Sequence, residues 1–271
     1  MGNVFDAMKK HEAEQGDRAP LAGPRPVAPG DAPPPEVRGP RRAAVSMNGY
    51  SPLMVAHHDR GSKRTEEYRA LRTNLQAQYQ DGRFCILVTS AEPGEGKTVT
   101  CANLAVVLAE RPEFRTLLVD CDLRRVRRGK VTSLFGIEES PGMADLLRAQ
   151  ASLADVVRTT SHTNLFVIPC GRVEADDVGG LLGKPEVDEI IGKLRHDYDY
   201  VLLDTPPLNQ FSDAGILGRA THEALLVVRM YKTPRESVDH AIRLLHAANV
   251  KPVGVVLTHQ KGNMSSYYRY S

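Results

Sequence analysis

From about residue 62 onward, short apolar runs alternate with segments whose apolar residues recur at helical spacing. The apolar runs predict buried strands at 84–89, 116–119, 164–169, 198–204, 224–228 and 253–257. The segments between them predict helices at 66–75, 98–108, 142–149, 152–158, 178–182, 187–194, 213–217 and 235–248. This alternation is typical of an α/β domain, with a mostly parallel central sheet and helices on both of its faces.

The first fifty residues have a different character. Residues 3–14 predict a short helix with Asn3 as its cap, which suggests a docking segment over residues 1–18. Eight of the 18 prolines lie between residues 19 and 40, so 19–50 is expected to be a semi-extended linker. The chain then divides into an α/β domain at 51–258 and a polar tail at 259–271.

Composition and charge narrow the classes of function. The net charge of +2 does not suggest a dedicated nucleic-acid binder. No apolar run approaches the roughly 18 residues of a membrane span, and the first residues lack the apolar core of a signal peptide, so a cytoplasmic location is expected. Cys85, Cys101, Cys121 and Cys170 show no CxxC spacing and are expected to be reduced, with Cys121 the more exposed because aspartates flank it.

A phosphate-loop pattern with the sequence AEPGEGKT lies at 91–98, between the first strand and the helix after it. Gly94 and Gly96 carry no side chain, so backbone N–H groups can close around phosphate oxygens. Lys97 would reach the β and γ phosphates, and the Thr98 hydroxyl would coordinate Mg²⁺. Strand, glycine-rich turn and helix aim a helix N-terminus at the phosphates, which predicts a nucleotide site.

Aspartates stand at the ends of two further predicted strands. Asp120 and Asp122 follow one strand, with Arg124 close behind, and Asp204 ends another. Because ligands of open α/β sheets collect at the carboxyl ends of strands, these side chains are expected in the same crevice as the phosphates. Asp204 occupies the position of a Walker B carboxylate, which orients Mg²⁺ or its bound water.

Several other polar patterns accompany these motifs. Asp213 is predicted to cap the helix that starts there, and 233–236 (TPRE) matches a capping box. The basic run 124–130 suits a solvated loop, a contact with phosphates or a phosphorylated partner, or a contact with anionic lipid. Spacing alone does not choose among these three.

Two patterns depend on context for their meaning. Glu66, Arg69 and Arg72 follow at steps of three on the polar face of the first predicted helix of the domain. On periodicity alone, this pattern favours charge pairing within the helix on a solvated surface. The tail carries three tyrosines with no core to bury them (Tyr267, Tyr268 and Tyr270), which would be able to reach a neighbouring molecule or to dock as an edge strand.

Taken together, the phosphate loop, the Asp-x-Asp-x-Arg at 120–124, the Asp-x-x-Pro at 204–207, the Glu-x-x-Arg-x-x-Arg at 66–72 and the terminal tyrosines resemble the bacterial tyrosine kinases. These are the autokinases of capsule and exopolysaccharide biosynthesis. The resemblance covers about residues 50–271 and implies the fold of the phosphate-loop NTPases.

The resemblance implies a role for each matching residue. ATP and Mg²⁺ would be the cofactors, and the nucleotide-binding set would be Gly94, Glu95, Gly96, Lys97, Thr98, Val99 and Arg124. Thr98, Asp120 and Asp204 would serve the metal, and Asp120 and Asp122 would accept the proton of the incoming tyrosine. Lys97, Asp120, Asp122 and Asp204 would then form the catalytic set.

The resemblance also implies partners. Glu66, Arg69 and Arg72 would join subunits into a ring, which presents the tail of one copy to the site of the next. A separate transmembrane polysaccharide co-polymerase would act as activator at the inner membrane face, and a phosphotyrosine phosphatase would reset the tail.

Two positions depart from the family pattern. Val126 replaces a proline, and Thr258 replaces an asparagine thought to meet the base. Two alternatives therefore stay open. One is a partitioning or septum-placing ATPase, although such proteins commonly carry a lysine where this chain has Glu92. The other is a nucleotide-binding scaffold without catalysis.

Overall fold

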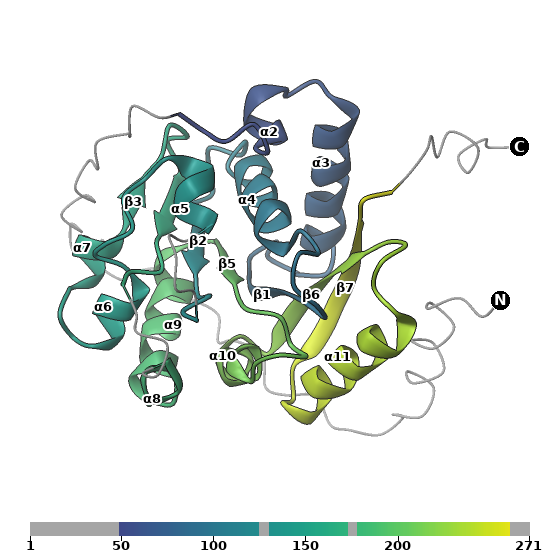
Figure 1. Cartoon of the computed structure of the whole chain (residues 1–271). Coiled ribbons are helices and arrows are strands. Elements are labelled where there is room, and N and C mark those ends of the chain that lie inside the picture. Colours follow the sequence, from purple (N-terminus) through teal and green to yellow (C-terminus); the bar gives the residue numbers. More distant parts are fainter. Residues whose placement is uncertain (1–48, 125–129, 173–177, 261–271) are drawn as a thin grey trace, which may run out of the picture. The chain divides into compact units, whose positions relative to one another are not determined.

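A computed structural model of the chain describes residues 49–124, 130–172 and 178–260 (Figure 1). The predicted N-terminal helix, the linker up to residue 48, most of the basic run and the tail tyrosines Tyr267, Tyr268 and Tyr270 lie outside the described residues, whereas Tyr50, at the predicted end of the linker, stacks on His57. Within the described ranges, none of the helices combines the length and the apolar character that crossing a bilayer requires.

A central sheet organises the described part of the chain, with seven strands in the order β3-β4-β2-β5-β1-β6-β7. The pairs formed by β1, β2 and β4–β7 are all parallel, and only the short β3 runs antiparallel, against β4. The strands are β1 (Phe84–Ser90), β2 (Thr116–Asp120), β3 (Arg158–Thr159), β4 (Leu165–Ile168), β5 (Tyr200–Asp204), β6 (Glu223–Arg229) and β7 (Lys251–Thr258). The predicted fold class is confirmed.

Helices cover both faces of this sheet (Figure 1). One face packs against α2 (Val55–His58), α3 (Lys63–Gln76), α4 (Lys97–Leu108) and α5 (Lys130–Phe135). The other packs against α6 (Met143–Leu147), α7 (Leu153–Val156), α8 (Val178–Leu182), α9 (Glu186–Asp197), α10 (Asp213–Thr221) and α11 (Arg235–Ala247). The domain therefore has three layers.

The continuous apolar character of the central strands follows from these layers. In β1, Cys85 and Leu87 belong to the core cluster on one face, while Ile86 and Val88 belong to the cluster on the other. A strand that is buried on both faces needs apolar residues at every position, not at alternate ones. All six strands predicted from apolar runs are confirmed, and this burial explains the five of them that precede the partly exposed edge strand β7.

The elements that sequence patterns missed are short. Neither α2 nor α5 was predicted, and the predicted helix at 152–158 ends at Val156, because Arg158 and Thr159 form β3 instead. All four cysteines are free and buried. The expected greater exposure of Cys121 is wrong, since its side chain is fully enclosed in the core. Burial raises the pKa of the Cys85 thiol to about 12, which makes it chemically inert.

Candidate functional site

The predicted phosphate loop joins the carboxyl end of β1 to the start of α4. Gly94 and Gly96 have φ angles of 79° and 95°, in the left-handed region that side chains disfavour. No side chain caps the first turn of α4, whose N-cap residue is Gly96. The backbone N–H groups of this turn can therefore donate to an anion, and the helix dipole favours one there.

Lys97 lies among the strand-end acids. Its Nζ donates to Asp122 Oδ2 at 3.4 Å and to Thr98 Oγ1 at 3.5 Å, and it lies 3.5 Å from Asp204 Oδ1. The side chains of Lys97, Asp122 and Asp204 are only 7%, 8% and 1% exposed. The register of β2 on β5 places Asp120 directly opposite Asp204. The structure thus brings together the lysine, the threonine and all three predicted carboxylates.

The carboxylate of Asp204 gives the test of whether a metal fits. Neither of its oxygens accepts a hydrogen bond from any described residue, although the side chain is fully buried. A buried carboxylate that has Lys97 Nζ at 3.5 Å but accepts no hydrogen bond from the described residues is costly, which indicates a polar ligand at this place. Among the described residues no three His, Cys, Asp or Glu side chains form a chelating group. Mg²⁺ fits such a site because it uses one or two carboxylates together with waters and phosphates.

Arg124 and Asp213 form an ion pair that the sequence did not predict. Arg124 Nε lies 2.7 Å from Asp213 Oδ2 and the second guanidinium nitrogen lies 2.8 Å from Oδ1, with the guanidinium stacked over Phe211. The prediction that Asp213 caps α10 is wrong: Ser212 is the N-cap residue, and Asp213 is the first helical residue. Arg124, predicted to bind nucleotide, is therefore held beside the start of α10.

The two variable residues of the loop face the protein. The carboxylate of Glu95 is buried and accepts the hydroxyl of Thr233. The predicted capping box at 233–236 is therefore wrong, because the threonine side chain makes no cap bond to α11. Asn209 Nδ2 donates to Glu92 Oε1 at 3.1 Å. Val99 packs its side chain against the core. Glu95 and Val99 can thus offer only backbone groups to a phosphate.

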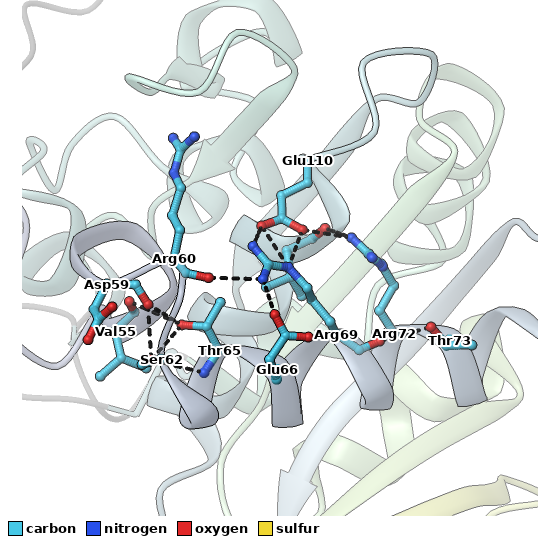
Figure 2. A network of polar contacts seen from close by, with 11 residues as sticks. Val55, Asp59, Arg60, Ser62, Thr65, Glu66, Arg69, Arg72, Thr73 and Glu110 are labelled. Atoms are coloured by element: carbon cyan, nitrogen blue, oxygen red, sulfur yellow. Dashed lines mark hydrogen bonds and ion pairs between the residues drawn. The ribbon is translucent and has the colours of Figure 1, made fainter.

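Glu66, Arg69 and Arg72 meet a partner from another element (Figure 2). Glu110, just beyond the end of α4, accepts from Arg69 Nε at 2.9 Å and from Arg72 Nη1 at 3.0 Å. Arg69 also donates to Glu66 Oε1 at 2.5 Å. The surface pairing within one helix, which the spacing favours, is therefore incomplete. A negative charge at a helix C-terminus interacts unfavourably with the helix dipole. The position of Glu110 just after α4 was therefore the signal in the sequence that this carboxylate would be paired with cations.

Comparison with known proteins now adds a family to this geometry. The family model described as an AAA domain matches residues 85–232. Tyrosine-protein kinase YwqD of Bacillus subtilis (strain 168) is 32% identical over 218 residues, which cover 80% of this chain and 90% of that protein. The kinase domain of the Escherichia coli tyrosine kinase ETK superposes with a TM-score of 0.72 at 28% identity, covering 80% of this chain and 84% of that one.

A second kind of protein shares the fold. The septum site-determining protein MinD of Pyrococcus horikoshii OT3, solved with Mg-ADP, superposes with a TM-score of 0.54 at 27% identity, covering 64% of this chain and 71% of that one. The match to the tyrosine kinases is closer and longer. Because four fifths of this chain align with the tyrosine-protein kinase YwqD at 32% identity, the chain belongs to the bacterial tyrosine-protein kinases, a family of protein-tyrosine kinases that carry the AAA domain.

Proposed function

We propose that the chain is an ATP-dependent autokinase whose copies phosphorylate one another on the tail tyrosines Tyr267, Tyr268 and Tyr270. The observation that carries the proposal is the place of Lys97, between two buried carboxylates at the end of a phosphate loop. Phosphoryl transfer asks a protein mainly to position the phosphates and to stabilise charge. The family supplies the acceptor class, because its members are named tyrosine-protein kinases.

The nucleotide would be held by the phosphate loop. In this proposal Lys97 turns from Asp122 and Asp204 toward the β and γ phosphates, while backbone N–H groups of the loop and of the first turn of α4 donate to phosphate oxygens. The Thr98 hydroxyl and the carboxylates of Asp120 and Asp204 would hold Mg²⁺, Asp204 through a bound water. When bound, Mg²⁺ offsets the negative charge that builds on the phosphates during transfer.

The acceptor needs a base. A tyrosine hydroxyl has an ordinary pKa of about 10, so at neutral pH it must lose its proton as the new bond forms. Asp122 and Asp120 would accept that proton. Asp122 Oδ2 lies 3.4 Å from Lys97 Nζ. In the proposal, the ammonium group of Lys97 moves to the phosphates, and the carboxylate of Asp122 can then turn to the tyrosine hydroxyl and accept its proton.

Assembly and partners complete the proposal. The face with Glu66, Arg69 and Arg72 would join copies into a ring, and a separate transmembrane co-polymerase at the inner face of the membrane would activate it. Each tyrosine phosphate adds about −1.5 to −2 charge, so a fully modified tail gains on the order of −5. We expect this charge to loosen the ring until a phosphatase resets the tail, and so to cycle capsule or exopolysaccharide synthesis.

Transfer is tested by incubating the purified chain with labelled ATP and Mg²⁺, with and without a candidate activator fragment, and mapping the label. We expect label on the tail tyrosines, and none in a Lys97→Met variant or in a variant with all three tail tyrosines changed to Phe. Light scattering then compares the unmodified and fully phosphorylated protein. Identical assemblies would sink the idea of cycling.

The alternative with a specific observation behind it is hydrolysis of ATP to water, as a partitioning ATPase. The likeness to MinD supports it. Against it, the position at which such proteins commonly carry a lysine holds Glu92, which is hydrogen-bonded to Asn209. Free phosphate without tyrosine label would establish this alternative. If neither free phosphate nor labelled tyrosine forms, the chain is a non-catalytic scaffold.

A further inference from the structure

The last residue of β7 lies against the phosphate loop. Thr258 Oγ1 donates to the carbonyl oxygen of Glu95 at 2.7 Å, with Val228 O a more distant acceptor at 3.4 Å. A Cβ placed on Gly96 would lie 3.6 Å from Thr258 Cγ2, so the Thr258 side chain occupies the space beside Gly96 into which any larger residue would extend. Gly96 is the left-handed residue that turns the loop into α4. Thr258 therefore touches the loop at the turn that orients its backbone N–H groups.

The side chain of Glu95 fastens the same residue on its other side. Its carboxylate accepts the backbone N–H of Glu92 at 2.6 Å, the backbone N–H of Arg229 at 3.0 Å and the hydroxyl of Thr233. The side chain is buried. Of these donors, one belongs to the loop itself and two to the segment that leaves β6. Glu95 is thus bound through its carboxylate to the end of β6 and through its carbonyl to the end of β7.

These two strand ends are themselves joined. Arg229 pairs with Thr258 in the register of β6 on β7, and the backbone N–H of Met230 donates to the carbonyl of Thr258 at 3.1 Å. A loop with two left-handed glycines has many conformations open to it, and a nucleotide must select the one that converges its N–H groups. Fastening Glu95 to two strand ends removes part of that freedom before nucleotide binds.

We infer that Thr258 is a positioning residue for the nucleotide, because its hydroxyl holds the phosphate loop in the shape that accepts phosphates. The chain continues from Thr258 into the tail, and His259 Nδ1 lies 3.1 Å from the same hydroxyl. This role of Thr258 couples the nucleotide site to the tail, and that coupling rests on the proposed function. A pull on the tail that lengthens the hydrogen bond between Thr258 and Glu95 should lower the affinity for nucleotide. By linkage, bound nucleotide should then oppose movement of the tail by the same free energy.

The test measures the dissociation constant of a fluorescent ADP with Mg²⁺ for the full chain and three variants. Thr258→Val keeps the shape but removes the hydroxyl, and we expect it to weaken binding about tenfold, as the loss of one hydrogen bond implies. Thr258→Ser restores the donor and should bind within about twofold of the wild type. Thr73→Val is the matched control, because it removes a hydroxyl that donates to a backbone carbonyl on α3 at 3.0 Å, far from the loop in sequence.

A double-mutant cycle separates positioning from folding. Glu95→Gln places an amide group against the donors that the Glu95 carboxylate accepts, and it should also weaken ADP binding. In the double variant with Thr258→Val, the loss of binding free energy should be smaller than the sum of the two single losses, because both changes act on one loop. For Thr258→Val, the apparent KM for ATP should rise, while kcat at saturating ATP changes little. Equal ADP affinity in Thr258→Val, or a Thr258→Ser variant as weak as Thr258→Val, overturns the inference.

The outcome is independent of the proposed kinase activity. If Thr258 controls ADP affinity but no tyrosine is labelled, the positioning role stands and the autokinase proposal fails. If the tail is labelled while Thr258→Val binds ADP as the wild type does, the reverse holds. Should Thr258→Val prove unstable in thermal unfolding, Thr258→Ala, which also lacks the hydroxyl, measured against Thr258→Ser gives the same decision.

Discussion

The two ends of α4 carry two charged clusters of opposite character. At its start, Lys97 is shared between Asp122 and Asp204 at 3.4 and 3.5 Å, and all three side chains are nearly dry. At its end, Glu110 receives two guanidinium groups, from Arg69 and Arg72, and its side chain is 23% exposed (Figure 2). One helix thus connects the nucleotide site that we propose to the face that we propose for assembly.

The difference lies in how completely the charges are satisfied. Asp204 accepts no hydrogen bond from the described residues, whereas both oxygens of Glu110 accept from arginines. A buried charge without donors lowers stability, and a chain retains it when a ligand uses it. A hydrogen-bonded ion pair at the surface contributes to stability instead. The first cluster should therefore trade stability for activity, and the second should not.

The largest effect is expected for Asp204→Asn. Removing the charge should lower the rate of phosphoryl transfer by on the order of a hundredfold or more, because stabilisation of the metal and phosphates is lost. The melting temperature should change little, because Lys97 keeps Asp122 as its partner at 3.4 Å when the charge of Asp204 is removed, and so no unpaired buried charge is left. Initial rates with labelled ATP and thermal unfolding check both. Asp239→Asn, at an exposed pair with Arg235 on α11, is the matched control.

If Asp204→Asn keeps a tenth of the wild-type rate, the buried acid is not part of the nucleotide machinery. If it keeps no rate and also melts early, Asp204 is structural. Only the combination of lost activity and retained stability supports the contrast between the two ends of α4.

The second effect is on stability alone. Glu110→Gln should lower the free energy of unfolding by about 1 to 2 kcal/mol, because two charge-assisted hydrogen bonds weaken at a site that solvent partly screens. ADP affinity should be unchanged. Denaturant unfolding is measured at dilutions where the chain is monomeric. Glu113→Gln is the control, since that exposed pair with Arg111 should leave stability unaltered. A Glu110→Gln variant as stable as the control contradicts the assignment.

The meeting of the strand-end acids beside the phosphate loop could be predicted from sequence, and the contacts that hold the loop could not. Continuous apolar runs mark the parallel strands, and Asp120 and Asp204 end two of them, so topology alone brings these residues together. Arg124 and Asp213 are 89 positions apart, and Thr258 and Glu95 are 163 apart. No local pattern links such residues, because their pairing depends on where separate loops end in space.

Local signals also misled where a side chain found a better partner. Thr233 precedes a helix with the spacing of a capping box, yet its hydroxyl donates to Glu95. Asp213 stands at a helix start but pairs with Arg124. In both positions a nearby charged group, the carboxylate of Glu95 or the guanidinium of Arg124, attracts the side chain more strongly than a neutral cap does.

The third effect is a pH window in the second cluster. The hydrogen bond from Arg69 is the main cause that lowers the pKa of Glu110 below its usual value. A carboxylate with a depressed folded-state pKa stabilises the fold fully above its unfolded pKa, about 4.3, and loses that contribution as the pH falls further. The stability gap between wild type and Glu110→Gln should therefore be constant near neutral pH and close in acid. A gap that does not change with pH would show that packing, not charge, holds Glu110.

The smallest effect on stability is expected for Glu66→Gln. The Glu66 side chain is 61% exposed and pairs with Arg69 one turn away. Such surface pairs contribute about 0.3 kcal/mol, so thermal unfolding of the monomer should barely change. Glu67→Gln, the adjacent exposed position, is the control. Light scattering at high concentration then measures the oligomeric state of both variants. If Glu66→Gln is monomeric while Glu67→Gln still assembles, Glu66 acts between copies, whereas Glu110 acts within one copy. Equal assemblies would place the proposed ring contact elsewhere.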